Sequence, residues 1–138
     1  MKLIFATGEA NKAIAKWVSD RIPHVSEFSN MMTIGVQSEN GQPLGAVVYH
    51  EYRDNDIQMS CAADDKHWLS KKALEAIFRY PFSQLGCIRV TALTPSKNVH
   101  TRQFLERVGF TQEGIMRKGF CDDDCVVYGM LRDECKWI

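Results

Sequence analysis

The stretch from Asp56 to Phe110 places the strongest constraint on how this chain can fold. Its pattern predicts a strand over residues 57–63, a helix over 64–85, a strand over 87–94 and a helix over 98–108. In the first strand, side chains alternate with the period of two that a pleated segment with one buried face requires. Two strands joined by such a helix form a right-handed parallel unit. The chain is therefore predicted to contain a central parallel strand pair.

The helix predicted over residues 64–85 has one apolar side, which indicates that it packs on a sheet. This side is formed by Leu69, Ala73, Leu74, Ile77, Phe78 and Phe82. Pro81 removes a backbone hydrogen bond and is expected to bend or end the helix near Tyr80, before Gly86. At the start of such a helix, backbone N–H groups have no partner within the helix and can hold an anion.

The flanking segments extend this unit into a mixed sheet. Before it we expect a strand over 3–6, a helix from Thr7 to Pro23, a loop over 24–30, and strands over 31–37 and 44–52 joined through Glu39-Asn40-Gly41. After it, strands over 111–120 and 126–131 flank the acidic turn 122–124. The expected fold is α/β (α+β), with about seven mostly antiparallel strands and about three helices.

Composition limits the partners and the compartment. The chain has 138 residues, 17 basic and 17 acidic side chains, which predicts one domain over 1–138 and no general attraction to nucleic acid or membrane. Its five cysteines are scattered and odd in number, so we interpret them as reduced thiols in the cytoplasm. The first six residues are too short for a signal sequence, and no apolar run approaches about 18 residues.

Part of the sequence resembles a known enzyme family. The residues that carry the resemblance are Ile88-Arg89-Val90-Thr91-Ala92, Asn98, Arg102 to Phe110, Glu113-Gly114 and Arg117. They are similar to the GNAT superfamily of N-acetyltransferases, closest to the branch with the ribosomal-protein alanine acetyltransferases, over residues 44–131. The resemblance implies a sheet whose central parallel strands splay into a V. It also implies that acetyl-CoA, the acyl donor, enters this gap and passes its acetyl group directly to an amine.

The same resemblance implies a set of cofactor-binding residues. A pantetheine arm consists of amides and can pair with a strand edge at Met59, Cys61 and Ala63. Its phosphates would meet the helix start, with Lys66, His67 and Lys71 nearby and the N–H groups of Leu69 and Ser70 as donors. Two residues of the next helix each have two possible roles. Asn98 binds the pantetheine or caps the helix. Arg102 binds a CoA phosphate or lies on a solvated helix face.

The chain departs from the family at the pyrophosphate loop. Where the family has Arg or Gln followed by two small residues, Asp65, Trp68 and Ser70 stand here. A tryptophan adds bulk at the helix start, and the charges of Asp64 and Asp65, which suit a helix cap, would repel a pyrophosphate. The loop therefore either retains CoA binding through backbone donors and lysines, or has lost it.

The catalytic candidates also have alternatives. Glu51 and His50 can relay a proton from the amine, or can simply end a solvated strand. Tyr128 can protonate the leaving thiolate or serve packing, and the family's general-acid tyrosine aligns with Leu105, so that role is not carried over. Cys61 is a candidate acyl-cysteine, although its place in the alternating strand favours the core. Cys121 and Cys125 lack the partners of a zinc site, so no metal is expected.

Three functions follow. The first is an N-acetyltransferase that uses acetyl-CoA; the alternative is a non-catalytic GNAT-fold binding or assembly module, and the third is a site for another acyl carrier or nucleotide. The amine acceptor is not identified by the sequence. A homodimer is suggested by the short N-terminal half and the apolar end 135–138.

Overall fold

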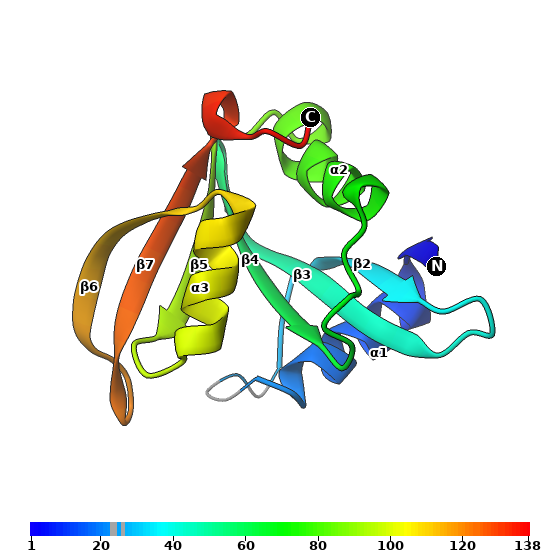
Figure 1. The fold of residues 1–138 in the computed structure, drawn as a ribbon, viewed down its shortest axis with the longest axis horizontal. Helices are drawn as coiled ribbons and strands as arrows, with labels where there is room; N and C mark the ends of the chain where they lie inside the picture. Colours follow the sequence, from blue (N-terminus) through cyan, green and yellow to red (C-terminus); the bar gives the residue numbers. More distant parts are fainter. Residues whose placement is uncertain (23–24, 26) are drawn as a thin grey trace.

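The computed structural model describes residues 1–22, 25 and 27–138. Seven strands form one sheet in the order β1-β2-β3-β4-β5-β7-β6, and of these neighbours only β4 and β5 run parallel (Figure 1). The elements are β1 (Lys2–Phe5), α1 (Gly8–Ser19), β2 (Met32–Gln37), β3 (Pro43–Arg53), β4 (Asp56–Ala63), α2 (Lys71–Arg79), β5 (Arg89–Pro95), α3 (Val99–Val108), β6 (Thr111–Phe120) and β7 (Asp123–Leu131). The predicted mixed, mostly antiparallel sheet with three α-helices is confirmed.

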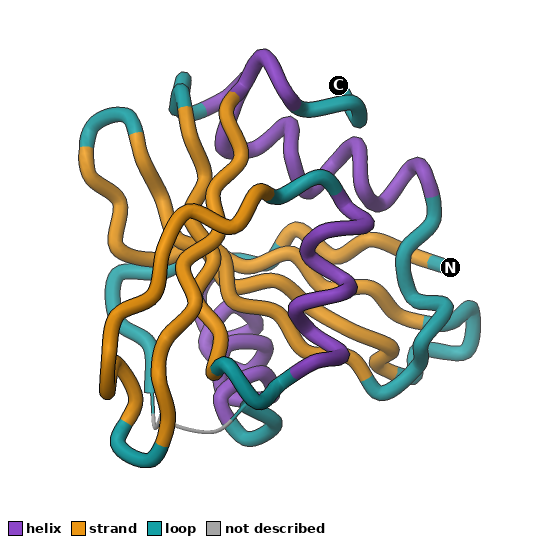
Figure 2. The backbone as a smooth tube through the Cα atoms, turned by 60° about the vertical axis from the view of Figure 1, so that its left-hand side comes forward, coloured by secondary structure: helices purple, strands orange, loops and turns teal. Residues whose placement is uncertain are grey.

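The sheet carries helices on both faces. On one face, Ala15 and Val18 of α1 pack against Ala46 and Val48 of β3. The other face forms the main core with α2 and α3, and the Tyr49 hydroxyl donates a hydrogen bond of 2.6 Å to the Ile77 carbonyl of α2. Figure 2 shows the strands crowded together at one point and fanning apart away from it. This arrangement gives β4 one face toward α1 and one toward α2 and α3.

The helix after β4 begins later than the sequence predicted. Residues 64–70 form a loop, and α2 starts at Lys71 with Ser70 as its N-cap, whose hydroxyl accepts a hydrogen bond of 3.1 Å from the Ala73 N–H. The expected cap at Asp64 or Asp65 is therefore wrong. Asp65 instead accepts a hydrogen bond of 2.7 Å from the His67 N–H, which stabilises a turn within the loop.

The effect of Pro81 is confirmed. The α-helix ends at Arg79 and continues as one wider π-helical turn over Tyr80–Gln84, where the Leu85 N–H donates to the Tyr80 carbonyl at 3.0 Å. Because proline has no N–H, the regular pattern of α-helical hydrogen bonds breaks at this position. Gly86, with a φ of 74°, then turns the chain toward β5.

Other predicted boundaries shift slightly. The carboxylate of Asp123 accepts hydrogen bonds from the Ser96 hydroxyl and the Lys97 N–H, and that of Asp124 accepts one from the Lys118 N–H. β7 begins at Asp123 and so reaches back into the predicted acidic turn. Helix α1 ends at Ser19. The predicted stop at Pro23 and loop residues 24 and 26 lie outside the described residues.

The parallel pair at the centre is short. Its register joins Asp56 to Arg89, Ile57 to Val90 and Gln58 to Thr91, and ends there although both strands continue. The two strands diverge beyond this point, as Figure 1 shows. The predicted V-shaped splay is confirmed. In the part of the chain that the structure describes, no helix is long and apolar enough to span a membrane.

Candidate functional site

The open edge of β4 faces the gap that the two diverging strands leave. The Asp64 N–H donates a hydrogen bond of 2.9 Å to the Leu44 carbonyl, on the β3 side. Because main-chain groups along a strand point alternately to either side, those of Cys61 and Ala63 point toward β5. The β4–β5 register has already ended at Gln58 and Thr91. These peptide groups therefore form a free strand edge inside the gap.

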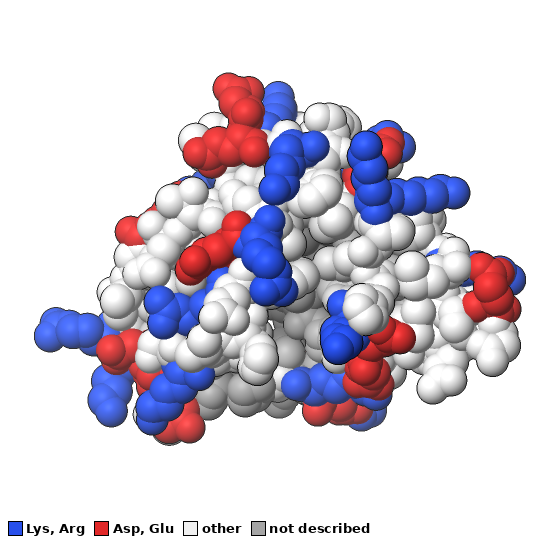
Figure 3. All heavy atoms as spheres, in the orientation of Figure 1, with Lys and Arg blue, Asp and Glu red and all other residues white. Residues whose placement is uncertain are grey.

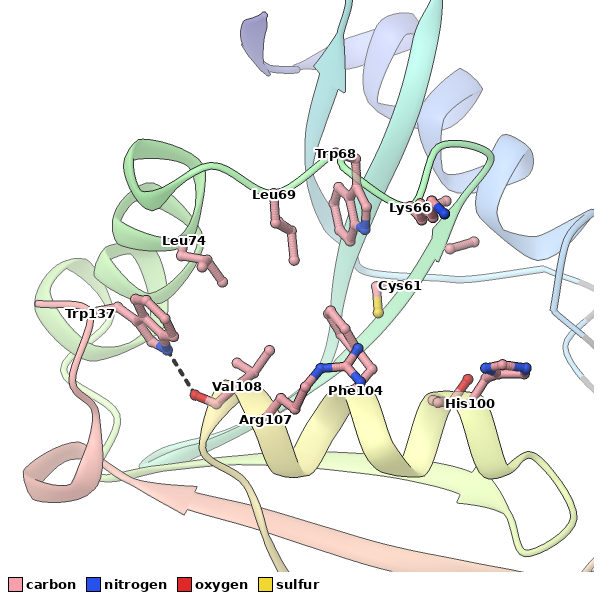
Figure 4. A pocket seen from close by; sticks show the side chains of 13 residues that line it. Cys61, Lys66, Trp68, Leu69, Leu74, His100, Phe104, Arg107, Val108 and Trp137 are labelled. Atoms are coloured by element: carbon pink, nitrogen blue, oxygen red, sulfur yellow. Dashed lines mark hydrogen bonds between the residues drawn. The ribbon is translucent and has the colours of Figure 1, made fainter.

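A cavity of about 450 Å³ lies along this edge, between β4, the loop 64–70, α2 and α3 (Figure 4). Its lining residues are Cys61, Ala62, Ala63, Lys66, Trp68, Leu69, Leu74, His100, Thr101, Phe104, Arg107, Val108 and Trp137. In the space-filling view, Lys and Arg side chains border the hollow on this face, with acidic side chains among them (Figure 3). The cavity thus combines an apolar interior with a charged rim.

Trp68 forms a wall of this cavity. Its indole is 5% exposed and lies against Gly45 of β3, where a Cβ atom would come within 2.5 Å of two ring carbons. The side chain therefore points to the sheet, and not across the start of α2. The bulk expected at the helix start is placed beside the cavity, which remains open.

The start of α2 offers unpaired backbone donors. The N–H groups of Leu69, Ser70, Lys71 and Lys72 have no acceptor among the residues that the structure describes. Such groups, at the positive end of a helix dipole, suit a phosphate. Of the basic residues predicted here, Lys66 lines the cavity, whereas His67 and Lys71 are exposed beside it.

The negative charge of Asp64 is neutralised locally. Its carboxylate accepts hydrogen bonds of 2.8 and 2.9 Å from the guanidinium of Arg21, which lies 3.7 Å from the centre of the Trp17 ring. The hydrogen bond from Arg21 lowers the pKa of Asp64. The repulsion expected between this aspartate and a phosphate is thereby reduced.

Five polar or aromatic residues of the cavity were not predicted, namely His100, Thr101, Phe104, Arg107 and Trp137. His100, Phe104 and Arg107 lie three or four residues apart on α3, the spacing of one helix face, and this periodicity is the signal that would have found them. The guanidinium of Arg107 has no ion-pair partner among the described residues. Trp137 reaches the cavity from the end of the chain, for which the sequence holds no periodic signal. The homodimer predicted from the apolar end stays a prediction.

Of the predicted proton relay, His50 lies on the other face of the sheet. His50 Nε2 is 2.8 Å from the Ser60 hydroxyl, and its ring contacts Phe28 with 4.9 Å between centroids. Burial lowers the pKa of His50, opposed by the carboxylate of Glu51. Glu51 is exposed and has a φ of 54° at an irregularity in β3. Neither side chain lines the cavity.

Tyr128, Arg102 and Asn98 hold α3 in place. The buried Tyr128 hydroxyl donates to Glu106 at 3.0 Å and accepts from Arg102 Nε at 3.2 Å. Arg102 also donates to the Ser96 carbonyl and to Gln112, and Asn98 accepts from the Thr101 N–H at 3.2 Å as the N-cap of α3. The structure does not bring these three residues to the cavity. The contacts of Tyr128 fit the packing role, and those of Asn98 fit the helix-capping role, that were predicted as alternatives from the sequence.

Cys61 has the environment of an unreactive thiol. Burial raises its pKa to about 11, so the thiol is protonated at neutral pH and is a poor nucleophile. Met59, two residues earlier, faces an adjoining void of about 30 Å³. All five cysteines are free thiols. Among the described residues, no cluster of three or more His, Cys, Asp or Glu side chains is arranged to hold a metal ion.

Comparisons with known proteins place this geometry in context. No family model matches the chain. No curated protein matches it either. Among solved structures, a mutant of the spermidine N-acetyltransferase SpeG from Vibrio cholerae superimposes with a TM-score of 0.67, 14% identity, and coverage of 80% of this chain and 69% of that one.

Two further structures give similar values. A T. thermophilus protein named as an acetyltransferase has a TM-score of 0.65 at 21% identity, covering 77% of this chain and 61% of that chain. A protein named a probable acetyltransferase has a TM-score of 0.66 at 23% identity, covering 77% and 63%. The chain therefore spans about two thirds of the length of these proteins. Together with the splayed β4–β5 pair, the superpositions show that this chain has the fold of the GNAT N-acetyltransferases.

Proposed function

We propose that this protein transfers an acetyl group from acetyl-CoA directly to an amine. The observation that carries the proposal is the free edge of β4 at Cys61 and Ala63, which faces a cavity in the fold of known acetyltransferases. A pantetheine arm carries two amides and can pair with this edge as an added strand would. The free thiols of the chain fit the reducing cytoplasm, where we place this activity.

The phosphates of the donor would lie at the rim. The N–H groups of Leu69 to Lys72 supply hydrogen bonds, and Lys66 and Arg107 supply positive charge from opposite walls of the cavity. These donors take the place of the glycine-rich loop that the sequence lacks. The Asp65 carboxylate keeps its charge but is held in the turn by the His67 N–H, and the neighbouring Lys66 supplies an opposing charge at the cavity.

The transfer step follows from this placement. The amine nitrogen attacks the thioester carbon, the carbon–sulfur bond breaks, and the thiolate of CoA leaves and takes up a proton. A backbone N–H at the gap stabilises the negative charge that develops on the carbonyl oxygen. Because the Cys61 thiol is protonated at neutral pH, we expect direct transfer without an acyl-cysteine intermediate.

The amine must also lose a proton, since a free primary amine has a pKa of roughly 10.4 and is charged at neutral pH. His50 is our first candidate for accepting it. Burial favours its neutral form, and it lies beside Ser60 of β4 on the face opposite the cavity. Glu51 is the second candidate, because it follows His50 in β3.

The amine acceptor is proposed from the comparisons. The SpeG structures are named as spermidine N-acetyltransferases, so polyamines are the first acceptors to test, followed by peptide N-termini and lysine. A non-catalytic binding module is the second candidate, favoured by Asp65, Trp68 and Ser70 at the positions of the family's phosphate loop. It predicts that ligand binding, if retained, is not followed by release of free CoA.

Calorimetry with acetyl-CoA tests the donor site, and release of free thiol with a panel of amines tests transfer. Lys66→Ala and Arg107→Ala are expected to weaken binding, whereas Lys12→Ala, on the exposed side of α1 with Glu9 as its partner, is the matched control. Absence of binding at millimolar acetyl-CoA would overturn the proposal. Binding without thiol release across the panel would favour the non-catalytic module.

A further inference from the structure

The chain does not end at the sheet but returns to the cavity. After β7, a short turn over Arg132–Glu134 is fixed by two hydrogen bonds from the Arg132 guanidinium to the Cys87 carbonyl, at 3.2 and 2.8 Å. The Leu131 N–H also donates to the Glu134 carboxylate at 2.9 Å. Residues 135–138 then pass between α2 and α3, and we call them the C-terminal tail.

Two side chains of this tail are attached to the end of α3. The indole N–H of Trp137 donates a hydrogen bond of 2.8 Å to the Val108 carbonyl, and the Lys136 ammonium lies 3.5 Å from the Arg107 carbonyl. The same ammonium is 5.0 Å from the centre of the Trp137 ring. Because its N–H is already bonded, the indole is fixed in orientation while it lines the cavity (Figure 4).

A tryptophan with a lysine close to it occurs on both sides of the cavity, once in the loop 64–70 and once in the C-terminal tail. The loop after β4 supplies Trp68 as an apolar wall and Lys66 as a cation to the lining. The tail supplies Trp137 to the lining, and Lys136 lies beside this ring, outside the lining itself. Neither lysine forms an ion pair with a carboxylate of the described residues. An indole next to an unpaired ammonium suits a ligand that joins apolar or aromatic parts to phosphate, which is the chemistry of a CoA thioester.

We propose that the C-terminal tail is part of the donor-binding site, with the Trp137 indole packing against the bound CoA thioester and Lys136 adding to the charge that attracts its phosphates. This inference rests on the proposed function. A ring held in place by the Val108 carbonyl loses little freedom when a ligand arrives, so its contact adds to affinity at low entropic cost. The C-terminal tail is thus assigned a binding role.

Tryptophan fluorescence tests the contact directly, because the chain has three tryptophans. A variant that keeps only Trp137 (Trp17→Phe with Trp68→Phe) is expected to change its emission when CoA is added. A variant that keeps only Trp17 (Trp68→Phe with Trp137→Phe) is the matched control, since Trp17 packs on the α1 face under Arg21. Its emission is expected to stay unchanged.

Calorimetry with CoA then measures the contribution to affinity. Trp137→Ala is expected to bind about tenfold more weakly, and Trp137→Phe, which keeps an aromatic face, to lie between it and the wild type. Lys136→Ala removes a charged side chain at an exposed position, and it is expected to weaken binding most at low salt. Far-UV circular dichroism shows whether each variant is folded. If Trp137→Ala does not fold, Trp137→Phe and Lys136→Ala still decide the question.

Two results separate the possible failures. If the wild type binds CoA but Trp137→Phe and Lys136→Ala bind equally well and the emission of Trp137 does not change, the tail is only structural and this inference is wrong. If the wild type itself does not bind CoA, the proposed function fails first, and the tail loses its assigned ligand with it.

Discussion

The indole of Trp68 lies so close to Gly45 that residue 45 cannot carry a side chain without displacing the ring. A Cβ atom there would be 2.5 Å from Cδ2 and Cε3 of the indole and 2.9 Å from Cγ. The tryptophan of the loop 64–70 and the glycine of β3 therefore fit against each other. This pair keeps the indole against the sheet and leaves the adjacent cavity open.

We expect Gly45→Ala to destabilise the protein by about 1–3 kcal/mol, because the buried ring must move or the strand must shift. Urea denaturation measures the free energy of unfolding. Displacing the indole toward the cavity should also weaken binding of acetyl-CoA, which calorimetry detects.

Gly114→Ala is the control for this change. Gly114 also lies in a strand and has an ordinary φ, and a Cβ atom added to it would meet no described neighbour within 4 Å. Its replacement should leave stability unchanged or slightly improved, since alanine is less flexible than glycine in the unfolded chain. Equal effects of the two substitutions would mean that the contact between residue 45 and Trp68 has no energetic weight.

The sequence was sufficient to predict the central unit of the fold. The period of two over 57–63 and the helical spacing from Ala73 to Phe82 each have one physical solution, a half-buried strand and a helix packed on it. The splay of the two central strands was predicted from the GNAT resemblance alone. It depends on where the hydrogen bonds between β4 and β5 stop. No local pattern in the sequence marks that point.

The site was predicted less completely, for two reasons. Residues 64–70 are a loop held by Asp65 and Ser70, and without its path the direction of Trp68 could not be known. Trp137 reaches the cavity through tertiary contacts with Val108, which lies far away in the sequence. Arg102 and Tyr128, in contrast, have polar ends suited to a ligand, but these ends are engaged by each other and by neighbouring residues.

The ion pair between Arg21 and Asp64 leads to a second prediction. Arg21→Ala leaves the Asp64 carboxylate uncompensated near the start of α2, so affinity for acetyl-CoA should fall about two- to fivefold at low salt. Adding Asp64→Asn to this variant should restore the affinity, because the repelling charge is removed. Both effects should shrink in high salt. A double variant as weak as Arg21→Ala alone would show that Arg21 acts through Trp17 or α1 instead.

The thiol of Cys61 should be unreactive toward alkylating reagents. Burial raises its pKa to about 11, so the thiolate that alkylating reagents require is scarce at pH 8. Iodoacetamide at this pH should label the exposed Cys121 and spare Cys61, as peptide mass spectrometry would show. Cys61→Ala should retain transfer activity. An acetylated Cys61 peptide trapped during turnover would contradict direct transfer.

His50 should make the folded protein sensitive to mild acid. Burial lowers its pKa below the ordinary value of 6.5 in the folded state, whereas the unfolded chain keeps that value. The unfolded state therefore binds more protons as the pH falls through 6.5, and the free energy of unfolding decreases in that direction. The contribution of His50 is fully present above pH 6.5 and is lost as the pH falls toward its lowered pKa. Urea denaturation between pH 5 and 8 should show a steeper loss for the wild type than for His50→Gln.

The lowered pKa of His50 also sets the pH profile of transfer if His50 accepts the proton from the amine. The neutral imidazole is the active form, so kcat/KM should stay level down to a pH below 6.5 and then fall, while His50→Gln should lower it across the whole range. If His50→Gln changes the stability profile but leaves kcat/KM intact, the histidine serves the packing of β3 with Ser60 and Phe28, and the proton passes to Glu51 or to water.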